Sequence, residues 1–168
     1  EADDVIGTLA RRAEPERPVV VSTSDKDLAQ LVTERITLVN TMTDSTLDPE
    51  GVREKFGVGP ERIVDLLALT GDTVDNVPGI PKVGPKTAAK WLNEFGDLDT
   101  LVARADEVKG KVGENLRAHL DQLPLSRELV TIRCDVELEE APDELFPAPQ
   151  DDETLLEKAH DAENGEKF

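Results

Sequence analysis

The chain has 168 residues, enough for one domain with a hydrophobic core, or for one compact body with a small helical appendage. Its 37 Asp and Glu against 19 Lys and Arg give a formal net charge of −18, which argues against binding of nucleic acid through overall charge. An aromatic content of 3%, without Tyr, argues against a stacking platform for single-stranded bases.

The few Cys and His residues limit the kinds of site that the chain can form. The one cysteine, Cys134, excludes an internal disulfide and a Cys-based zinc site, and with His119 and His160 alone a His-rich metal site is excluded too. We therefore expect a reducing, cytoplasmic location, and oxygen ligands for any metal ion. No apolar run approaches the roughly 18 residues that span a bilayer, so no membrane partner is predicted.

The first third of the chain predicts alternating helices and strands. Apolar residues at helical spacing from Val5 to Ala10 predict a helix, and a continuous apolar run predicts a buried strand over residues 18–23. A short helix capped by Ser24 follows over residues 25–32, and a second strand over residues 36–40. This alternation predicts an α/β fold with part of a mostly parallel sheet and flanking helices, whose ligands bind where strands end.

Helical patterns dominate after Asp48. They are predicted over residues 49–56, 60–69, 85–95, 98–103 and 114–132, the last with a break at Pro124, whereas the alternating residues 135–139 are too acidic to assign. We divide the chain into an α/β region at 1–48, a helical region at 49–140 and an acidic C-terminal tail at 141–168. Because the chain opens at Glu1 inside a helical pattern, we expect it to be a fragment of a longer protein.

Seven acidic residues stand out by position. They are Glu1, Asp3, Asp4, Asp25, Asp27, Asp72 and Asp75. The first three form an E-x-D-D pattern, which a chain this acidic produces about once or twice by chance. Asp151-Asp152-Glu153 is interpreted as such a chance match, so the pattern alone is weak.

The placement of the later acids makes the case stronger. Asp25 and Asp27 directly follow the predicted strand at 18–23, and Asp72 and Asp75 project from a turn after Gly71. Crowded carboxylates repel one another, and a cation is the usual reason for proteins to tolerate them. Two Mg²⁺ ions about 4 Å apart would need about this many oxygen ligands and would act on a phosphodiester.

Residues 76–93 contain no acid and three lysines, in contrast to the rest of the chain. Gly79 and Gly84 permit a tight turn with positive φ, and a helix beginning after that turn presents N–H groups that bind phosphate. Lys82, Lys86 and Lys90 recur every four residues on one side and could follow a nucleic-acid backbone.

This segment has two other interpretations. One is an ordinary helix–turn–helix corner whose lysines are solvated. The other is a nucleotide-binding P-loop, which fits poorly because Pro85 stands where a phosphate-binding N–H is needed and no strand precedes Gly79.

The acids and the segment of residues 76–92, which we name the hairpin, resemble in this order the 5′-3′ exonuclease domains of bacterial DNA polymerases, which belong to the flap endonuclease family. The matching stretches are residues 1–10, 22–32, 67–80, the hairpin through Leu92, and 131–138. The similarity runs from residue 1 to about residue 140, whereas the last 25 or so residues match poorly.

The resemblance implies a PIN-like 5′-nuclease core, followed by a helix-hairpin-helix, and a catalytic role for five of the acids: Glu1, Asp3, Asp4, Asp25 and Asp27. Glu1 and Asp3 would hold the first of two Mg²⁺ or Mn²⁺ ions, which activates water. Asp4, Asp25 and Asp27 would surround the ion pair, with Asp72 and Asp75 on the side of the second ion.

The resemblance also implies that the hairpin grips duplex DNA that carries a 5′ flap or 5′ end, often with a K⁺ ion on its carbonyls. The residues expected at DNA are Gly79, Ile80, Lys82, Val83, Gly84, Lys86, Thr87 and Lys90. Enzymes of this family remove 5′ flaps and primers in replication and repair, and they release 5′-phosphates by metal-assisted hydrolysis.

Compared with the family, these 168 residues do not include the N-terminal half, with its first strand, further Asp ligands and basic helical arch, nor a polymerase domain, and we expect both in the parent protein. We expect the seven carboxylates to come together, but full activity to need the missing half. Two alternatives stay open: a non-catalytic duplex-DNA-binding helix-hairpin-helix module, and an acidic protein of a saline cell whose carboxylates only keep it solvated.

Overall fold

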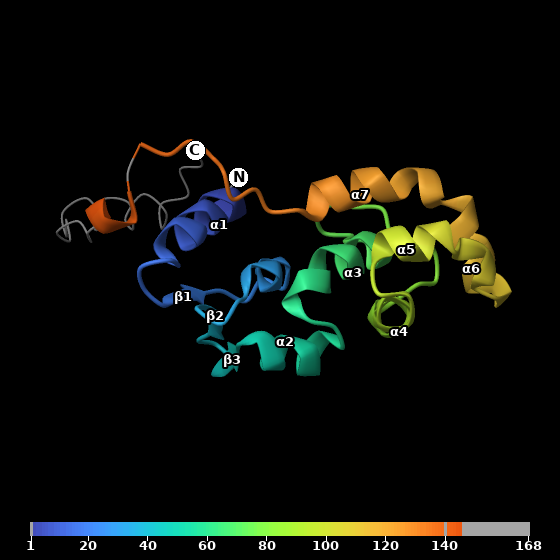
Figure 1. The fold of residues 1–168 in the computed structure, drawn as a ribbon, viewed down its shortest axis with the longest axis horizontal. Helices are drawn as coiled ribbons and strands as arrows, with labels where there is room; N and C mark the ends of the chain where they lie inside the picture. The colour runs from blue at the N-terminus through green and yellow to red at the C-terminus, as the bar shows by residue number, and fades with distance from the viewer. Residues whose placement is uncertain (1, 140, 146–168) are drawn as a thin grey trace, which may run out of the picture.

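The computed structural model describes residues 2–139 and 141–145, so Glu1 and most of the predicted acidic tail lie outside the described residues. Figure 1 shows an elongated molecule. Helix α1 (Ala2–Ala13) and a small sheet form one end, and helices α4 to α7 form the other. Helix α3 (Ile63–Thr70) lies between them, so the predicted order of an α/β part and a helical part is confirmed.

The sheet has the strand order β1-β2-β3. Strands β1 (Val19–Ser22) and β2 (Ile36–Asn40) are parallel, as predicted, with Val19 opposite Ile36. Strand β3 (Ser45–Leu47) was not predicted, and because it is antiparallel to β2, with Leu38 opposite Leu47, the sheet is mixed rather than mostly parallel.

The turn between β2 and β3 explains the reversal of the chain. The Asn40 side chain accepts two backbone N–H groups from the residues that follow it, and Asp44 adopts a left-handed conformation with φ of 50°. Asn and Asp tolerate such turns well because their short side chains bond to nearby backbone.

The predicted helix at 25–32 is a shorter 3₁₀ helix, η1 (Asp27–Leu31), and Ser24 does not cap it. Two side-chain bonds order the residues before it instead. Thr23 Oγ1 accepts the N–H of Asp25 at 3.0 Å, and Asp25 Oδ1 accepts the N–H of Asp27 at 2.9 Å.

Most predicted helices are confirmed. Helix α2 (Pro49–Phe56) is capped by Asp48, and α4 (Pro85–Phe95) and α5 (Leu98–Ala103) have the predicted bounds. The helical stretch predicted at 114–132 with a break at Pro124 is two helices, α6 (Gly110–Ala118) and α7 (Leu123–Val130), and the break lies earlier than predicted, in the 3₁₀ turn that joins them. Pro124 lies in the first turn of α7, where its missing N–H costs no helical hydrogen bond.

Helix α3 forms the centre of the core and is almost entirely apolar. Its buried residues Ile63, Leu66, Leu67, Ala68 and Leu69 are at most 3% exposed. The helix packs against η1 on one side and against α4 and α7 on the other. It therefore joins the two ends of the molecule and fixes the position of the loop that follows it.

Asp65 of α3 is buried and fully used by the fold. One carboxylate oxygen pairs with Arg127 of α7 at 2.8 Å, and the other accepts the N–H of Leu98 at 3.1 Å. Since both of its oxygens have partners, Asp65 is a structural carboxylate that ties α3 to α5 and α7.

The segment after α7 returns along α1. Asp4 Oδ1 accepts the N–H of Arg133 at 2.8 Å, and Thr8 Oγ1 accepts that of Val136 at 3.2 Å. The alternating residues 135–139 form no strand, and they lie beside α1 as irregular chain. No helix within residues 2–139 and 141–145 is both long enough and apolar enough to cross a membrane.

Candidate metal centre and nucleic-acid interface

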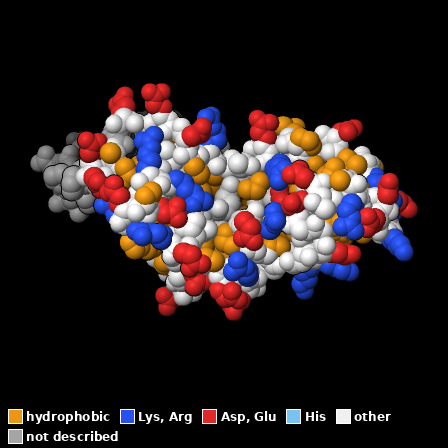
Figure 2. Space-filling model, viewed as in Figure 1, with side chains coloured by type: hydrophobic (Ala, Val, Ile, Leu, Met, Phe, Trp, Pro, Cys, Tyr) orange, Lys and Arg blue, Asp and Glu red, His pale blue; other side chains and the backbone are white. Residues whose placement is uncertain are grey.

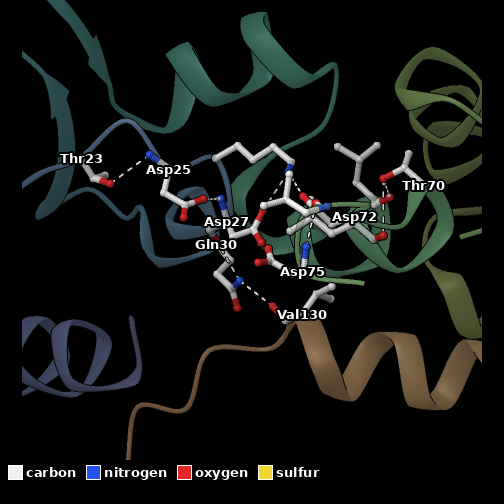
Figure 3. Close-up of polar contacts among 12 residues, drawn as sticks. Thr23, Asp25, Asp27, Gln30, Thr70, Asp72, Asp75 and Val130 are labelled. Atoms are coloured by element: carbon white, nitrogen blue, oxygen red, sulfur yellow. Dashed lines mark hydrogen bonds and ion pairs between the residues drawn. The ribbon is translucent and has the colours of Figure 1, made fainter. Parts of the chain in front are cut away.

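Two loops on neighbouring elements carry a group of three carboxylates (Figure 3). Asp27 begins η1, just after β1, and Asp72 and Asp75 lie in the turn after α3. That turn is closed by a pair of backbone hydrogen bonds between Asp72 and Val77 at 3.0 and 2.7 Å. Gly71 starts the turn with φ of 70°, a conformation that glycine adopts readily.

Asp27, Asp72 and Asp75 each offer one carboxylate oxygen, and these three oxygens lie within 4.8 Å of one another. We name these residues the carboxylate cluster. The exposed fraction of the side chain is 15% for Asp27 and 7% for Asp72, while Asp75 is exposed. Asp27 Oδ1 is buried and accepts no hydrogen bond from the described residues. An oxygen donor set with an unsatisfied buried oxygen fits a hard divalent cation.

The environments of Asp27 and Asp72 shift their pKa values in opposite directions. Burial, with smaller contributions from Asp25, Asp72 and Asp75, raises the pKa of Asp27 to about 6, although Lys26 opposes the rise. Hydrogen bonds from the Lys26 ammonium and from the N–H of Val74 lower the pKa of Asp72. The surroundings of Asp72 thus favour its ionised form, whereas burial makes ionisation of Asp27 unfavourable.

Asp25 lies directly beside the carboxylate cluster without belonging to it. Its side chain is exposed and its Oδ1 holds the N–H of Asp27, as Figure 3 shows. Asp25 therefore orients the start of η1, and its charge contributes to the raised pKa of Asp27.

Asp3 and Asp4 lie on α1 and are also outside the cluster. They line a cavity of about 630 Å³ together with residues 127–133, and Asp4 binds the backbone of Arg133. Of the seven acids expected to come together, the structure therefore unites three and places Asp25 next to them. The metal roles of Asp3, Asp4 and Asp25 stay predictions, and Glu1 lies outside the described residues.

Hydrogen bonds attach the hairpin, which follows the cluster, to α3 and to the later helical region. The N–H of Ile80 binds the carbonyl of Leu69 in α3 at 2.9 Å. Three side chains of the later helical region bind hairpin carbonyls: Asn115 binds Pro81, Gln122 binds Gly79, and Ser126 binds Pro78, at 2.6, 3.1 and 2.7 Å. The helical region thus holds the hairpin in a fixed position next to the carboxylate cluster.

The expected role of the hairpin glycines is wrong. Neither Gly79 nor Gly84 has positive φ, and Asn76 and Lys82 take that conformation instead, with φ of 55° and 67°. Gly79 is required for another reason, because a Cβ there would lie 2.1 Å from the carbonyl oxygen of Thr70. Gly84 precedes α4 in an extended conformation, and a Cβ there would meet nothing within 4 Å.

The residues expected at DNA fall into two groups. Lys82, Lys86 and Lys90 are exposed, and Figure 2 shows basic side chains projecting from the edge formed by α4 and α6. The side chains of Ile80 and Val83 are 2% and 5% exposed and belong to the core, so only their backbone can face a ligand.

Lys109 lines the same groove as two of these lysines. A groove of about 650 Å³ between α4 and the start of α6 is lined by Lys86, Lys90 and Lys109, and also by Glu94 and Glu107. Lys109 was missed because it follows Lys90 by 19 residues, and only the packing of α6 brings it near.

Lys26 was missed as well, although it stands between two predicted ligands. Its Nζ pairs with Asp72 Oδ2 and lies 3.6 Å from Asp27 Oδ1. The only signal in the sequence was its position between Asp25 and Asp27.

Comparison with protein families places both parts of the chain in one family. Residues 1–57 match the 5′-3′ exonuclease N-terminal resolvase-like domain, and residues 58–153 match the 5′-3′ exonuclease C-terminal SAM fold. The domain boundary predicted after residue 48 stays a prediction.

Among curated proteins the chain is similar to DNA polymerase I of several bacteria. It is 54% identical to that of Pseudomonas aeruginosa over 165 residues, and 44% identical to that of Bacillus caldotenax over 162 residues. Each alignment covers 93% of this chain and 18% of the relative, so the chain spans less than a fifth of the length of these relatives.

Solved structures give the same fold. The T5 5′-exonuclease with bound zinc superposes with a TM-score of 0.73 at 25% identity, over 77% of this chain and 49% of that one. The T5 D15 flap endonuclease in complex with DNA and metal ions superposes with a TM-score of 0.71 at 24% identity, over the same shares of the two chains.

Proposed function

The chain belongs to the 5′-3′ exonuclease family, and from this premise we propose that it is part of a metal-dependent 5′-3′ exonuclease or flap endonuclease. The proposed substrate is duplex DNA with a 5′ flap or 5′ end. The proposed reaction is hydrolysis of a phosphodiester in replication or repair. A location in the cytoplasm and a polymerase domain in the parent protein are proposed with it, on the similarity to bacterial DNA polymerase I.

The carboxylate cluster is the observation that carries this proposal. Three aspartates from two loops converge, and one buried oxygen, Asp27 Oδ1, has no hydrogen-bond partner among the described residues. Its one ion pair among the described residues is the longer one to Lys26, at 3.6 Å, whereas both oxygens of the structural Asp65 have close partners. The T5 5′-exonuclease, which shares the fold, binds zinc.

In the proposed reaction the cluster residues would hold one Mg²⁺ or Mn²⁺ ion, and Asp25, Asp3 and Asp4 would contribute ligands to a second. A divalent cation held there would supply Lewis-acid stabilisation of the charge that develops on the phosphodiester. Asp72, whose pKa is lowered, contributes a carboxylate that stays ionised. Asp27 contributes a buried carboxyl group, which must lose its proton before it can bind a cation.

The hairpin and α4 position the DNA relative to the cluster. The hairpin follows directly after the turn that holds Asp72 and Asp75, which supports the proposal that a duplex bound at the hairpin would extend toward the carboxylates. Lysines bind phosphates without regard to base, which suits an enzyme that acts on structure rather than sequence. A K⁺ ion on the hairpin carbonyls stays a prediction.

Cleavage of a 5′-labelled flap duplex tests the proposal. We expect the 168-residue chain to release products slowly, with 5′-phosphates, only when Mg²⁺ or Mn²⁺ is present, and at least 100-fold more slowly after Asp27→Asn. Asp106→Asn is the matched control, since that side chain is 98% exposed and lies between α5 and α6. Cleavage in EDTA, or equal rates for wild type and Asp27→Asn, would contradict the proposal.

A second candidate function is a duplex-DNA-binding module without catalysis. The groove with Lys86, Lys90 and Lys109 favours it, because three ammonium groups line a surface that contains none of the cluster carboxylates. Tight duplex binding together with no uptake of Mn²⁺ and no cleavage in any divalent metal would favour this candidate over the nuclease.

A further inference from the structure

Lys26 is the cation that the fold itself supplies to the carboxylate cluster. It precedes η1, and its side chain reaches from the loop after β1 to the turn after α3, where Nζ pairs with Asp72 Oδ2. The same nitrogen lies 3.6 Å from Asp27 Oδ1, the buried oxygen without a hydrogen bond. The ammonium thus touches both of the least exposed carboxylates of the cluster.

The ion pairs found within residues 2–139 and 141–145 place Lys26, and no other Lys or Arg, against these carboxylates. The other basic side chains that form ion pairs contact carboxylates elsewhere in the fold, as Arg127 contacts Asp65 and Asp99. Three carboxylates with one ammonium leave an excess of negative charge when all are ionised. The pairing therefore connects the two loops, but it does not neutralise the cluster.

An ammonium and a divalent cation compete for the same oxygens. Mg²⁺ binds oxygen at about 2.0–2.1 Å and demands regular geometry, so an ammonium cannot keep its hydrogen bond along the same direction. A unit positive charge about 4 Å from the ion also repels it, by an amount that depends on how much water lies between them. The Lys26 side chain is 46% exposed, which leaves it room to turn toward solvent.

We propose that Lys26 is an internal counter-cation of the carboxylate cluster, which occupies Asp72 in the absence of metal and is displaced when a divalent ion binds. Lys26 is then a positioning residue: it keeps the two loops in place, and it sets the ion concentration that the cluster requires. This inference rests on the proposed metal site, but it assigns to the chain a device for tuning that site.

A purely structural role for Lys26 gives the opposite expectation. If the lysine only bridges the loops, its loss lets Asp27 and Asp72 separate and weakens metal binding. If it competes with the ion, its loss strengthens metal binding. The sign of the change in affinity therefore distinguishes the two roles.

Calorimetric titration of the 168-residue chain with Mn²⁺ at low ionic strength measures that sign. Lys26→Gln removes the charge and keeps a group that can donate to Asp72, and we expect it to bind Mn²⁺ about tenfold more tightly than wild type. Lys26→Arg keeps the charge and pairs well with carboxylates, so its affinity should equal or fall below that of wild type. Lys111→Gln on α6 is the matched control, because its exposed side chain pairs with Glu114 instead.

A second measurement needs no variant. The ¹⁵N signal of the Lys26 ammonium in the wild-type chain should move to the position of a solvated lysine as Mg²⁺ is added, while that of Lys111 stays in place. Equal or weaker Mn²⁺ binding by Lys26→Gln, or a Lys26 signal that ignores bound Mg²⁺, would overturn the inference alone. Absence of Mn²⁺ binding from both wild type and Lys26→Gln would overturn the metal site together with the inference.

Discussion

At the scale of single residues, Asp27 is a carboxylate whose position in the sequence predicted a function and whose environment in the structure alters its pKa. Its position after a buried strand predicted a functional carboxylate, and the structure adds burial and three negative neighbours. Burial is the largest cause, and together they raise its pKa to about 6, a shift of the kind that is common at functional sites.

This environment predicts a pH-dependent cost to the fold. Because the pKa of Asp27 in the folded chain lies above its ordinary value of 3.8, its deprotonation destabilises the folded state as the pH rises from about 4 to about 6. Asp27→Asn cannot lose a proton, so in EDTA its free energy of unfolding should exceed that of wild type at pH 7.5 but not at pH 4. Urea unfolding at both pH values measures this, and a difference that is the same at both would contradict it.

The pairing of Lys26 with Asp72 could not be predicted from the sequence. The two residues are 46 positions apart, and they meet because η1 packs against α3. The same holds for Asp4, whose hydrogen bond to Arg133 depends on the return of the chain along α1 after 129 residues. Local spacing finds acidic residues, whereas only the packed fold determines what each acid faces.

At the scale of elements, the hairpin depends on a close approach of two backbone segments. The N–H of Ile80 binds the last turn of α3, and this contact brings Gly79 against Thr70. The sequence pointed to both glycines of the hairpin, but only one of them has a steric reason that the structure shows.

Alanine substitutions separate the two glycines. Gly79→Ala would place a Cβ 2.1 Å from the Thr70 carbonyl oxygen and should cost about 2–4 kcal/mol of stability by forcing the backbone apart. Gly84→Ala is the matched control, because its Cβ meets nothing within 4 Å, and it should change stability by less than about 0.5 kcal/mol. Thermal unfolding measures both, and equal losses would contradict the assigned contact.

The groove between α4 and α6 predicts a distributed interaction with DNA phosphates. Replacing Lys86, Lys90 and Lys109 together by Ala should weaken duplex binding at least about tenfold and lower the salt dependence by about one ion for each phosphate that is no longer bound. Fluorescence anisotropy at several KCl concentrations measures both effects. Lys111→Ala serves as the control, and a triple variant with unchanged salt dependence would contradict this role.

The sequence predicted elements well where they are long or carry clear end signals. Asp48 and Gly57 bound α2, and Pro85 and Gly96 bound α4, as such residues usually do. Strand β3 was missed because its three residues are too short to show a period. The break before α7 was misplaced because Pro124 marks the start of a helix rather than an interruption.

At the scale of the whole molecule, the acidic residues that produce the net charge of −18 have different roles. The carboxylate cluster gathers charge that a cation can offset, and Asp48, Asp65 and Asp97 stabilise helices or join them. The window at residues 76–93 is free of acids and carries lysines toward solvent. A chain of this kind can meet DNA through bound cations and one basic surface without being basic overall.

Binding of a divalent cation should therefore stabilise the whole fold. A ligand present at about 100 times its Kd contributes roughly 2.7 kcal/mol when it binds only the folded state. Thermal unfolding should occur at a higher temperature in Mg²⁺ or Mn²⁺ than in EDTA, and this gain should vanish after Asp72→Asn but persist after Asp106→Asn. A gain that survives Asp72→Asn would place the ion elsewhere.

Calorimetric titration with Mn²⁺ shows whether Asp27, Asp72 and Asp75 together bind a divalent cation, on which the proposed nuclease function depends. We predict saturable uptake by the wild-type chain at pH 7.5, at least tenfold weaker uptake after Asp27→Asn or Asp72→Asn, and unchanged uptake after Asp106→Asn. Equal affinity in all four chains, or no uptake by wild type, would contradict this prediction.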